Sequence, residues 1–190
     1  RLKSGLSNQL FQYAFGRALA EKTGQPLFFD NTYFEEVKRD TIRLYELSKF
    51  KVEANCSIAP LLKYRYIKNK FLRKIMPIFG MSEPVRFFNE THFYYDEQVI
   101  HKCGSGINYY DGYWQSPRYF NAIRPILLEE LRLKSSLSPF SLALSEVIRG
   151  ENAVFVHVRR GDYAQNKKIS NIHGLCTLEY YQQAVEFLLK

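Results

Sequence analysis

Two adjacent arginines lie in a short charged turn late in the sequence, where they could hold a phosphate group. The turn, Arg159-Arg160-Gly161-Asp162, directly follows the hydrophobic run at residues 153–158. Arginine presents a planar fork of N–H donors that matches phosphate oxygens, and ligands of open α/β sheets bind outside the carboxyl ends of strands. Fixed cations there would stabilise the charge that grows on a nucleotide diphosphate as a glycosidic bond breaks. The alternative is a solvated turn in which Arg160 and Asp162 form a surface ion pair of little energetic value.

A turn of small residues near the start of the sequence could also attract an anion. Ser4-Gly5 leads into a predicted helix whose first polar residues are Asn8 and Gln9. Backbone amides at the start of a helix favour negative charge. Asn8 could instead be only the N-cap of this helix.

The only tryptophan, Trp114, lies in an aromatic block between these two motifs. The block is G-Y-W-Q-S-P-R-Y-F at residues 112–120, and its Ser116-Pro117 pair is typical of a capped helix start. An aromatic side chain followed by Gln115 could form a wall on which a sugar stacks. The alternative is that Trp114 packs in the core and that Ser116 merely caps the helix.

The elements that would position these motifs alternate between helix and strand. The apolar patterns predict helices at 8–23, 117–133, 139–150 and 177–190, and strands at 26–30, 109–114 and 153–158. This alternation predicts an α/β fold. The last strand, turn and helix open a βαβ unit, but two short segments cannot bury both faces of a parallel sheet. We therefore expect the chain to end early in a second Rossmann-like domain.

The composition fits a folded protein with an anionic partner. The chain has 190 residues, 46% of them hydrophobic, and a formal net charge of +8. That charge favours a nucleotide diphosphate, an acidic membrane or nucleic acid, and it also fits simple solubility. Three scattered cysteines without a C-x-x-C pair indicate neither a disulfide framework nor a zinc site, and they suit a reducing compartment. No apolar run approaches the roughly 20 residues that span a bilayer. We therefore expect either a cytoplasmic, bacterial-type protein or one whose membrane anchor has been removed, and the first is the prediction adopted.

The stretch at residues 61–79 mixes aromatic, aliphatic and basic side chains. It could be an ordinary helix whose long basic side chains cover its apolar stripe. It could also lie on an anionic membrane surface, which would make the protein peripheral on an inner membrane. A nucleic-acid patch is a further possibility. No RNA-binding signature accompanies it, and we expect no nucleic-acid partner.

Taken together, the three motifs resemble glycosyltransferase family 11, the bacterial-type α-1,2-fucosyltransferases. H-V-R-R-G-D-Y at residues 157–163 is similar to the signature shared by α-1,2- and α-1,6-fucosyltransferases. G-L-S-N-Q-L-F-Q-Y-A-F-G at residues 5–16 is similar to the N-terminal block of the α-1,2 branch, and the aromatic block at 112–120 is similar to the block between them. Because the order and approximate spacing also agree, the resemblance covers nearly the whole chain.

This resemblance implies a GT-B-like fold, in which two Rossmann-like domains face a cleft. Residues 1–150 would form the acceptor-side domain, and residues 151–190 would begin the GDP-fucose-binding domain. The implied activity is that of an inverting galactoside 2-alpha-L-fucosyltransferase, which moves L-fucose from GDP-β-L-fucose to the 2-hydroxyl of a terminal galactose. GDP-fucose is a substrate, the partner is a galactose-terminated oligosaccharide, and neither a cofactor nor a metal is expected. A fucosyltransferase of other linkage, or a non-catalytic basic protein that binds membranes or nucleic acid, is the alternative.

The resemblance also implies roles for the residues of the charged turn. Arg159 would bind the donor diphosphate, and Arg160 would support or share that contact. His157 and Asp162 would belong to the same nucleotide-sugar site. Both are candidates by type for the catalytic base, and Asp30 is a weaker one.

In the N-terminal block, the resemblance implies that Asn8 reaches the donor from the opposite domain and that Gly5 allows its close approach. Two serines, Ser4 and Ser7, stand where the family usually has glycines. Serine disfavours a positive φ, so this loop would be strained if either position were left-handed. The sequence ends at Lys190, from which we expect an incomplete copy of the donor-binding domain.

Overall fold

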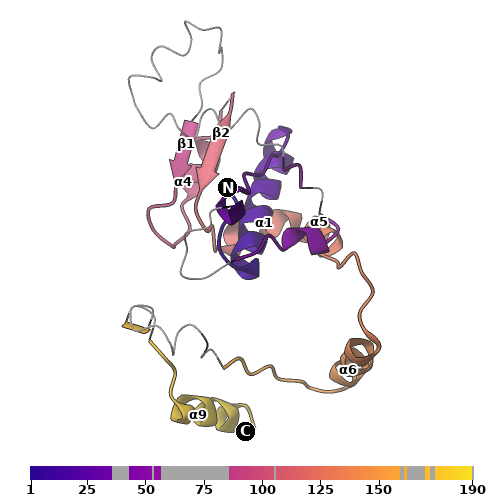
Figure 1. Cartoon of the computed structure of the whole chain (residues 1–190). Helices are drawn as coiled ribbons and strands as arrows, with labels where there is room; N and C mark the ends of the chain where they lie inside the picture. The colour runs from indigo at the N-terminus through magenta and orange to yellow at the C-terminus, as the bar shows by residue number, and fades with distance from the viewer. Residues whose placement is uncertain are drawn as a thin grey trace, which may run out of the picture. The chain divides into compact units, whose positions relative to one another are not determined.

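The computed structural model of the chain is shown in Figure 1. It describes residues 1–35, 43–52, 54–56, 86–104, 106–158, 161, 170–171 and 174–189. The internal contacts divide the chain into two compact units, Arg1–Ser136 and Leu137–Lys190. The basic stretch at 61–79 lies outside the described residues.

The first unit combines helices with a small parallel sheet. Its α-helices are α1 (Leu6–Thr23), α4 (Glu97–His101) and α5 (Arg124–Glu130), its strands are β1 (Arg86–Asn89) and β2 (Asn108–Asp111), and its 3-10 helices are η1 (Thr32–Glu35), η2 (Leu47–Lys49), η4 (Pro117–Tyr119) and η5 (Asn121–Ile123). The second unit contains α6 (Pro139–Gly150) and α9 (Leu178–Leu188). Helices mixed with a parallel strand pair confirm the α/β class. The GT-B arrangement, the second Rossmann-like domain and the boundary at residue 150 stay predictions.

The helix predicted at 8–23 is confirmed as α1, although it begins earlier, at Leu6. It ends where Gly24 takes a left-handed φ of 66° and donates its N–H to the Ala20 carbonyl at 2.8 Å. Glycine adopts this conformation without steric cost, so it stops the helix.

The strands β1 and β2 pair in parallel, from Arg86 opposite Asn108 to Asn89 opposite Asp111. Figure 1 shows the two strands side by side in the first unit, which also contains α1. The predicted strand at 109–114 is confirmed only in part, because the chain leaves β2 after Asp111. No strand was expected at β1.

The first residues of the chain connect β2 to the segment at 26–30. The backbone nitrogen of Arg1 donates to the Tyr110 carbonyl at 2.9 Å, and the Leu2 N–H donates to the Asp30 carbonyl at 2.8 Å. The strand predicted at 26–30 is wrong, because single bonds of this kind do not make the repeated ladder of a sheet.

The single helix predicted at 117–133 is also wrong. The structure has η4, η5 and the shorter α5 in its place. The reason is Pro125, which lies in the first turn of α5. A helix that began at Ser116 would place this proline in its interior, where it lacks an N–H and clashes with the preceding turn.

Apolar side chains form two clusters in the first unit. The larger cluster contains Leu2, Tyr13, Ala14, Phe29, Leu47, Val52, Ile123 and Leu127. The second surrounds Phe15, whose ring stacks on Trp114 with 4.4 Å between centroids and meets the edge of Tyr119. Because α1 contributes to both clusters, it joins the aromatic block to the rest of the core.

The two predicted helices of the second unit are confirmed, and both carry side-chain caps. The Ser138 hydroxyl accepts the N–H of Ser141 at the start of α6, and the Thr177 hydroxyl accepts the N–H of Tyr180 at the start of α9. The strand expected at 153–158 is not formed. Its side chains are exposed, because the described residues offer it neither a hydrogen-bonded neighbour nor an apolar surface. None of the described helices is both long and apolar enough to cross a bilayer.

The buried face of α1 includes the side-chain amide of Gln9, whose nitrogen and oxygen are both hydrogen-bonded. Its Nε2 donates to the carbonyls of Ser4 at 3.0 Å and Leu44 at 2.8 Å, and its Oε1 accepts the Glu46 N–H at 2.9 Å. A buried polar group without partners is costly, so these three bonds are what allow Gln9 to be fully buried. They hold two loops against α1.

Replacing Gln9 by methionine should lower the free energy of unfolding by about 3 kcal/mol, because methionine keeps the volume but leaves two carbonyls and an N–H unpaired. Denaturant unfolding followed by circular dichroism would measure the change. Gln98→Met is the matched control, since the Gln98 side chain is exposed and accepts a bond from Lys102. Equal losses in the two variants would contradict the role given to Gln9.

Candidate functional site

Two polar side chains of the N-terminal block, Ser4 and Asn8, meet the distant Gln115 at the start of α1. The Asn8 Nδ2 donates to the Ser4 Oγ at 3.0 Å, and the Gln115 Nε2 donates to the Asn8 Oδ1 at 2.6 Å. Asn8 and Gln115 are 107 residues apart in the sequence. The fold therefore brings the N-terminal block and the aromatic block together.

Among the described residues, no side chain caps the start of α1. Gly5 is the N-cap, with φ of −73° and ψ of 172°. A Cβ built on Gly5 would meet no described atom within 4 Å. Asn8 is the third residue of α1, so its interpretation as the N-cap is wrong. The first backbone amides of the helix supply partial positive charge beside the Asn8 side chain.

One residue of this cluster, Ser4, and the neighbour of another, Trp114, have a left-handed backbone. Ser4 has φ of 69° and Trp114 has φ of 56°, and among the described residues they are the non-glycine positions with positive φ. This conformation costs an L-residue about 1 to 2 kcal/mol. Such strain persists where the surroundings impose it, and it gathers at functional sites. The strain expected where serine replaces a family glycine is thus found at Ser4, whereas Ser7 lies inside α1.

A carboxylate, a buried amide and an aromatic stack impose the left-handed turn at Trp114. The Glu90 carboxylate accepts the N–H of Tyr113 at 2.6 Å and that of Trp114 at 3.0 Å. The Gln12 Nε2 donates to the Gly112 carbonyl at 3.1 Å. Gly112 is required here, because a Cβ would lie 2.6 Å from the Glu90 Cβ.

The sugar-stacking interpretation of Trp114 is wrong. Its side chain is 2% exposed and stacks on Phe15 inside the core. A ring packed in this way does not form a surface on which a sugar stacks. Trp114 instead anchors the turn that carries Gln115, which is exposed.

Sequence reasoning missed the three residues that hold this cluster, Gln9, Gln12 and Glu90. The glutamines left a signal, because they are polar residues three positions apart on the buried face of a predicted helix. Glu90 left none, since it contacts residues that are distant in the sequence.

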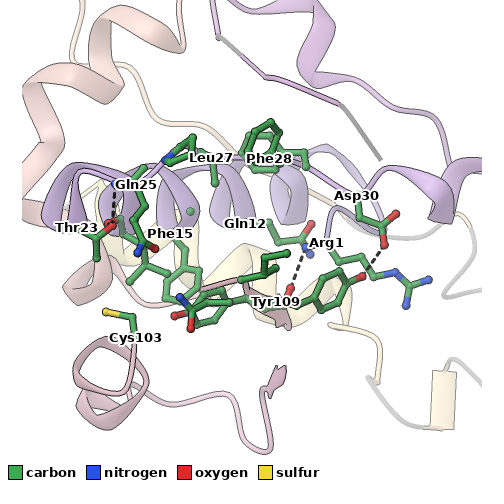
Figure 2. A pocket seen from close by; sticks show the side chains of 18 of the residues that line it. Arg1, Gln12, Phe15, Thr23, Gln25, Leu27, Phe28, Asp30, Cys103 and Tyr109 are labelled. Atoms are coloured by element: carbon green, nitrogen blue, oxygen red, sulfur yellow. Dashed lines mark hydrogen bonds between the residues drawn. The ribbon is translucent and has the colours of Figure 1, made fainter. Parts of the chain in front are cut away.

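A cavity of about 530 Å³ lies between α1, the segment at 25–30 and the residues around β2. Figure 2 shows Thr23 and Cys103 at one end and Asp30 and Tyr109 at the other. Apolar and aromatic side chains form most of the wall, including Phe15 and Leu27. At the polar end, the Asp30 carboxylate is already bound by other side chains.

Asp30 is buried, and both of its carboxylate oxygens accept hydrogen bonds. Its Oδ1 accepts the Thr32 N–H at 2.9 Å and the Thr32 hydroxyl at 2.6 Å, and its Oδ2 accepts the Tyr109 hydroxyl at 2.5 Å. Burial by itself raises the pKa of the Asp30 carboxyl, but the bonds from Thr32 and Tyr109 more than offset this and lower the pKa. A carboxylate with both oxygens occupied and a lowered pKa is poorly suited to act as a general base.

Asp111, at the end of β2, holds the cations of the first residues. Its Oδ1 accepts from the Lys3 Nζ at 2.6 Å, and its Oδ2 accepts from an Arg1 guanidinium nitrogen at 3.2 Å. Burial opposes ionisation of Asp111, but the hydrogen bond and the charge of Lys3, together with the charge of Arg1, lower its pKa. The side chains of Arg1 and Lys3 are therefore held in ion pairs with Asp111.

The charged turn lies mostly outside the described residues. Arg159, Arg160 and Asp162 fall in that part of the chain, so their roles stay predictions. His157 is described in the second unit, with an exposed side chain whose ring stacks on Phe155.

Comparison with known proteins decides the family. The profile of glycosyl transferase family 11 matches residues 1–190. The chain belongs to this family. It is 30% identical over 194 residues to an alpha-1,2-colitosyltransferase of Escherichia coli, a match that covers 99% of the chain and 62% of that relative. It is 26% identical over 210 residues to the O-antigen biosynthesis glycosyltransferase WbnK of Escherichia coli, a match that covers 98% of the chain and 66% of that relative.

The family 11 chain thus spans somewhat less than two thirds of the length of these curated relatives. No solved structure gives a significant match. Membership confirms the resemblance at family level.

The left-handed backbone at Ser4 predicts an inverted preference between glycine and alanine. Ser4→Gly should be more stable than Ser4→Ala by about 1 kcal/mol, because both lose the hydroxyl and only alanine keeps the steric cost. At Ser7, which lies inside α1, Ser7→Ala should be more stable than Ser7→Gly by about 0.5 to 1 kcal/mol. Thermal unfolding of the four variants tests this. The same order at both positions would contradict a left-handed Ser4.

The lowered pKa of Asp30 predicts how stability depends on acid. Its ionised form stabilises the fold above its ordinary pKa of about 3.8, and this contribution is lost as the pH falls through the lower folded value. Asp30→Asn should therefore be less stable than the wild type by about 2 kcal/mol at pH 7. The difference should shrink steadily below pH 3.8. Urea unfolding between pH 7 and pH 2 measures it, and a difference independent of pH would contradict the assignment.

Proposed function

We propose that the protein is an inverting galactoside 2-alpha-L-fucosyltransferase. Its donor is GDP-β-L-fucose, and its acceptor is the 2-hydroxyl of a terminal galactose in a surface glycan. The observation that carries the proposal is the family 11 match over residues 1–190, which includes the charged turn. The relative named as an alpha-1,2-colitosyltransferase supports an α-1,2 linkage, and the relative named for O-antigen biosynthesis supports a glycan acceptor of that class.

The relative named as an alpha-1,2-colitosyltransferase favours a second candidate donor sugar. Colitose is fucose without its 3-hydroxyl group, so the two sugars present similar shapes to a binding site. An alpha-1,2-colitosyltransferase is 30% identical to the chain. Transfer of colitose from its GDP derivative is therefore the alternative activity of the same site.

In the proposed reaction, the acceptor oxygen attacks C1 of the donor sugar from the face opposite the diphosphate. The bond from C1 to the diphosphate oxygen breaks, its electron pair stays on GDP, and the β-linked sugar becomes α-linked. Arg159 binds the diphosphate and Arg160 supports it, so that two guanidinium groups stabilise the growing charge. These cations serve the leaving group, and the proposal includes no metal.

The proton of the acceptor hydroxyl goes to a base within the donor site. His157 and Asp162 are the candidates for this role. Asn8 contacts the donor in this proposal, beside the backbone of Gly5. In this proposal the protein works in the cytoplasm, and the basic stretch at 61–79 contacts the inner-membrane surface.

Calorimetric titration of the full-length protein with GDP, GDP-fucose and UDP tests the nucleotide site. We expect both guanosine ligands to bind and UDP to bind more weakly. Arg159→Ala should lower the affinity for GDP about 10- to 100-fold, because a hydrogen bond to a charged group contributes a free energy of that size. Arg132→Ala is the matched control, because Arg132 is an exposed arginine paired with Glu129 at 2.7 Å. Absence of GDP binding by the wild type would sink the proposal.

The identity of the donor sugar is then determined by comparing kcat/KM for two donors. With a galactose-terminated oligosaccharide, kcat/KM for GDP-fucose should exceed that for GDP-colitose. A site that hydrogen-bonds the 3-hydroxyl rejects a sugar that lacks it, because its own polar groups are left unpaired. The reverse preference would assign the colitose activity instead.

A further inference from the structure

Gln115 is exposed, yet its side chain is held in one place by a bond to the amide of Asn8. The Gln115 Nε2 lies 2.6 Å from the Asn8 Oδ1. On its other side, the Asn8 Nδ2 donates to the Ser4 Oγ at 3.0 Å. The Asn8 amide is therefore anchored at both ends, and one N–H of its NH₂ group is left over to donate to a ligand.

The backbone that carries Gln115 is fixed on both sides. The residue before it is Trp114, whose left-handed backbone is clamped by Glu90 and whose ring is buried. Directly after it, the Ser116 N–H donates to the Trp114 carbonyl at 2.9 Å, which closes a three-residue turn around Gln115.

This support distinguishes the bond from an ordinary surface contact. Ordering a glutamine side chain costs conformational entropy, which a bond between two freely moving side chains offsets poorly. Here the Cα of Gln115 sits in a strained turn held by a carboxylate, and Asn8 sits in the first turn of a long helix. The two left-handed residues, Ser4 and Trp114, flank the same pair of amides.

We propose that Gln115 is a positioning residue, which holds the Asn8 amide in the place from which Asn8 contacts the nucleotide-sugar donor. This role rests on the proposed function. Gln115 acts through Asn8 and does not itself touch the donor. Its effect is preorganisation, because an amide that is already ordered loses less freedom when the donor binds.

The test is a double-mutant cycle on the full-length protein, with Gln115→Met, Asn8→Ala and the double variant. Methionine keeps the length of the side chain and removes the donor to Asn8. We expect Gln115→Met to raise the dissociation constant for GDP-fucose and its KM about fivefold, which is the size of one neutral hydrogen bond. The KM for the acceptor should not change. In the Asn8→Ala background, Gln115→Met should add less than about a further 1.5-fold.

Gln98→Met is the control, since Gln98 is an exposed glutamine with one side-chain bond, to Lys102, and should leave donor affinity unchanged. Thermal unfolding of the same variants measures the contact between Asn8 and Gln115 in the absence of donor. The losses of stability caused by the changes at positions 8 and 115 should be non-additive in that measurement too.

The possible results distinguish the positioning role of Gln115 from the proposed function. If the wild type binds GDP-fucose and Gln115→Met binds it equally well, the positioning role is wrong and the proposed function stands. If Gln115→Met weakens binding by the same factor with and without Asn8, Gln115 acts independently and the proposal is wrong. If the wild type does not bind GDP-fucose, the proposed function fails and the positioning role fails with it.

Discussion

The side-chain amides of Asn8, Gln9 and Gln12 on the first turns of α1 bind the loops around the helix. Gln9 makes its three bonds with backbone groups on two loops, and Gln12 bonds the Lys3 N–H and the Gly112 carbonyl. Buried amides must be paired, so the loops cannot move away without exposing or orphaning these groups. The candidate site depends on this constraint, because Asn8 can meet Gln115 only while the turn at 112–115, which Gln12 bonds at Gly112, stays against α1.

Strain and burial balance each other at the turn after β2. A left-handed tryptophan is unfavourable, but Trp114 recovers the cost by burying its ring on Phe15 and by donating its backbone N–H to Glu90. The exposed Gln115 is thereby carried on rigid structure. Functional side chains are held most precisely when their backbone is fixed by residues that do not themselves react.

Oriented amides and full positive charges have different roles in the proposed reaction. The first unit provides oriented amides and the start of a helix, which can recognise polar groups without carrying a full charge. The charged turn of the family signature provides two full positive charges, which suit a diphosphate leaving group. Family 11 membership is shown by the match over residues 1–190, whereas the proposed choice between fucose and colitose depends on contacts to a single hydroxyl group.

The sequence by itself determined the features that depend on near neighbours. Gly24 ends α1 through a bond to Ala20, and Ser138 and Thr177 start their helices through bonds three residues ahead. These signals lie within one turn of a helix, so they can be read along the chain. The family motifs are equally visible as letters, which is why the family could be predicted.

Only the tertiary structure decided which segments found partners. The expected strands at 26–30 and 153–158 did not form ladders, because a strand exists only with a neighbour and an apolar surface to cover. Whether Trp114 faced a ligand or the core was set by Phe15, far away in the sequence. The bond between Asn8 and Gln115 likewise joins residues that lie far apart in the sequence. Contacts of this kind depend on how loops close over the core, and no local pattern of residue types encodes that.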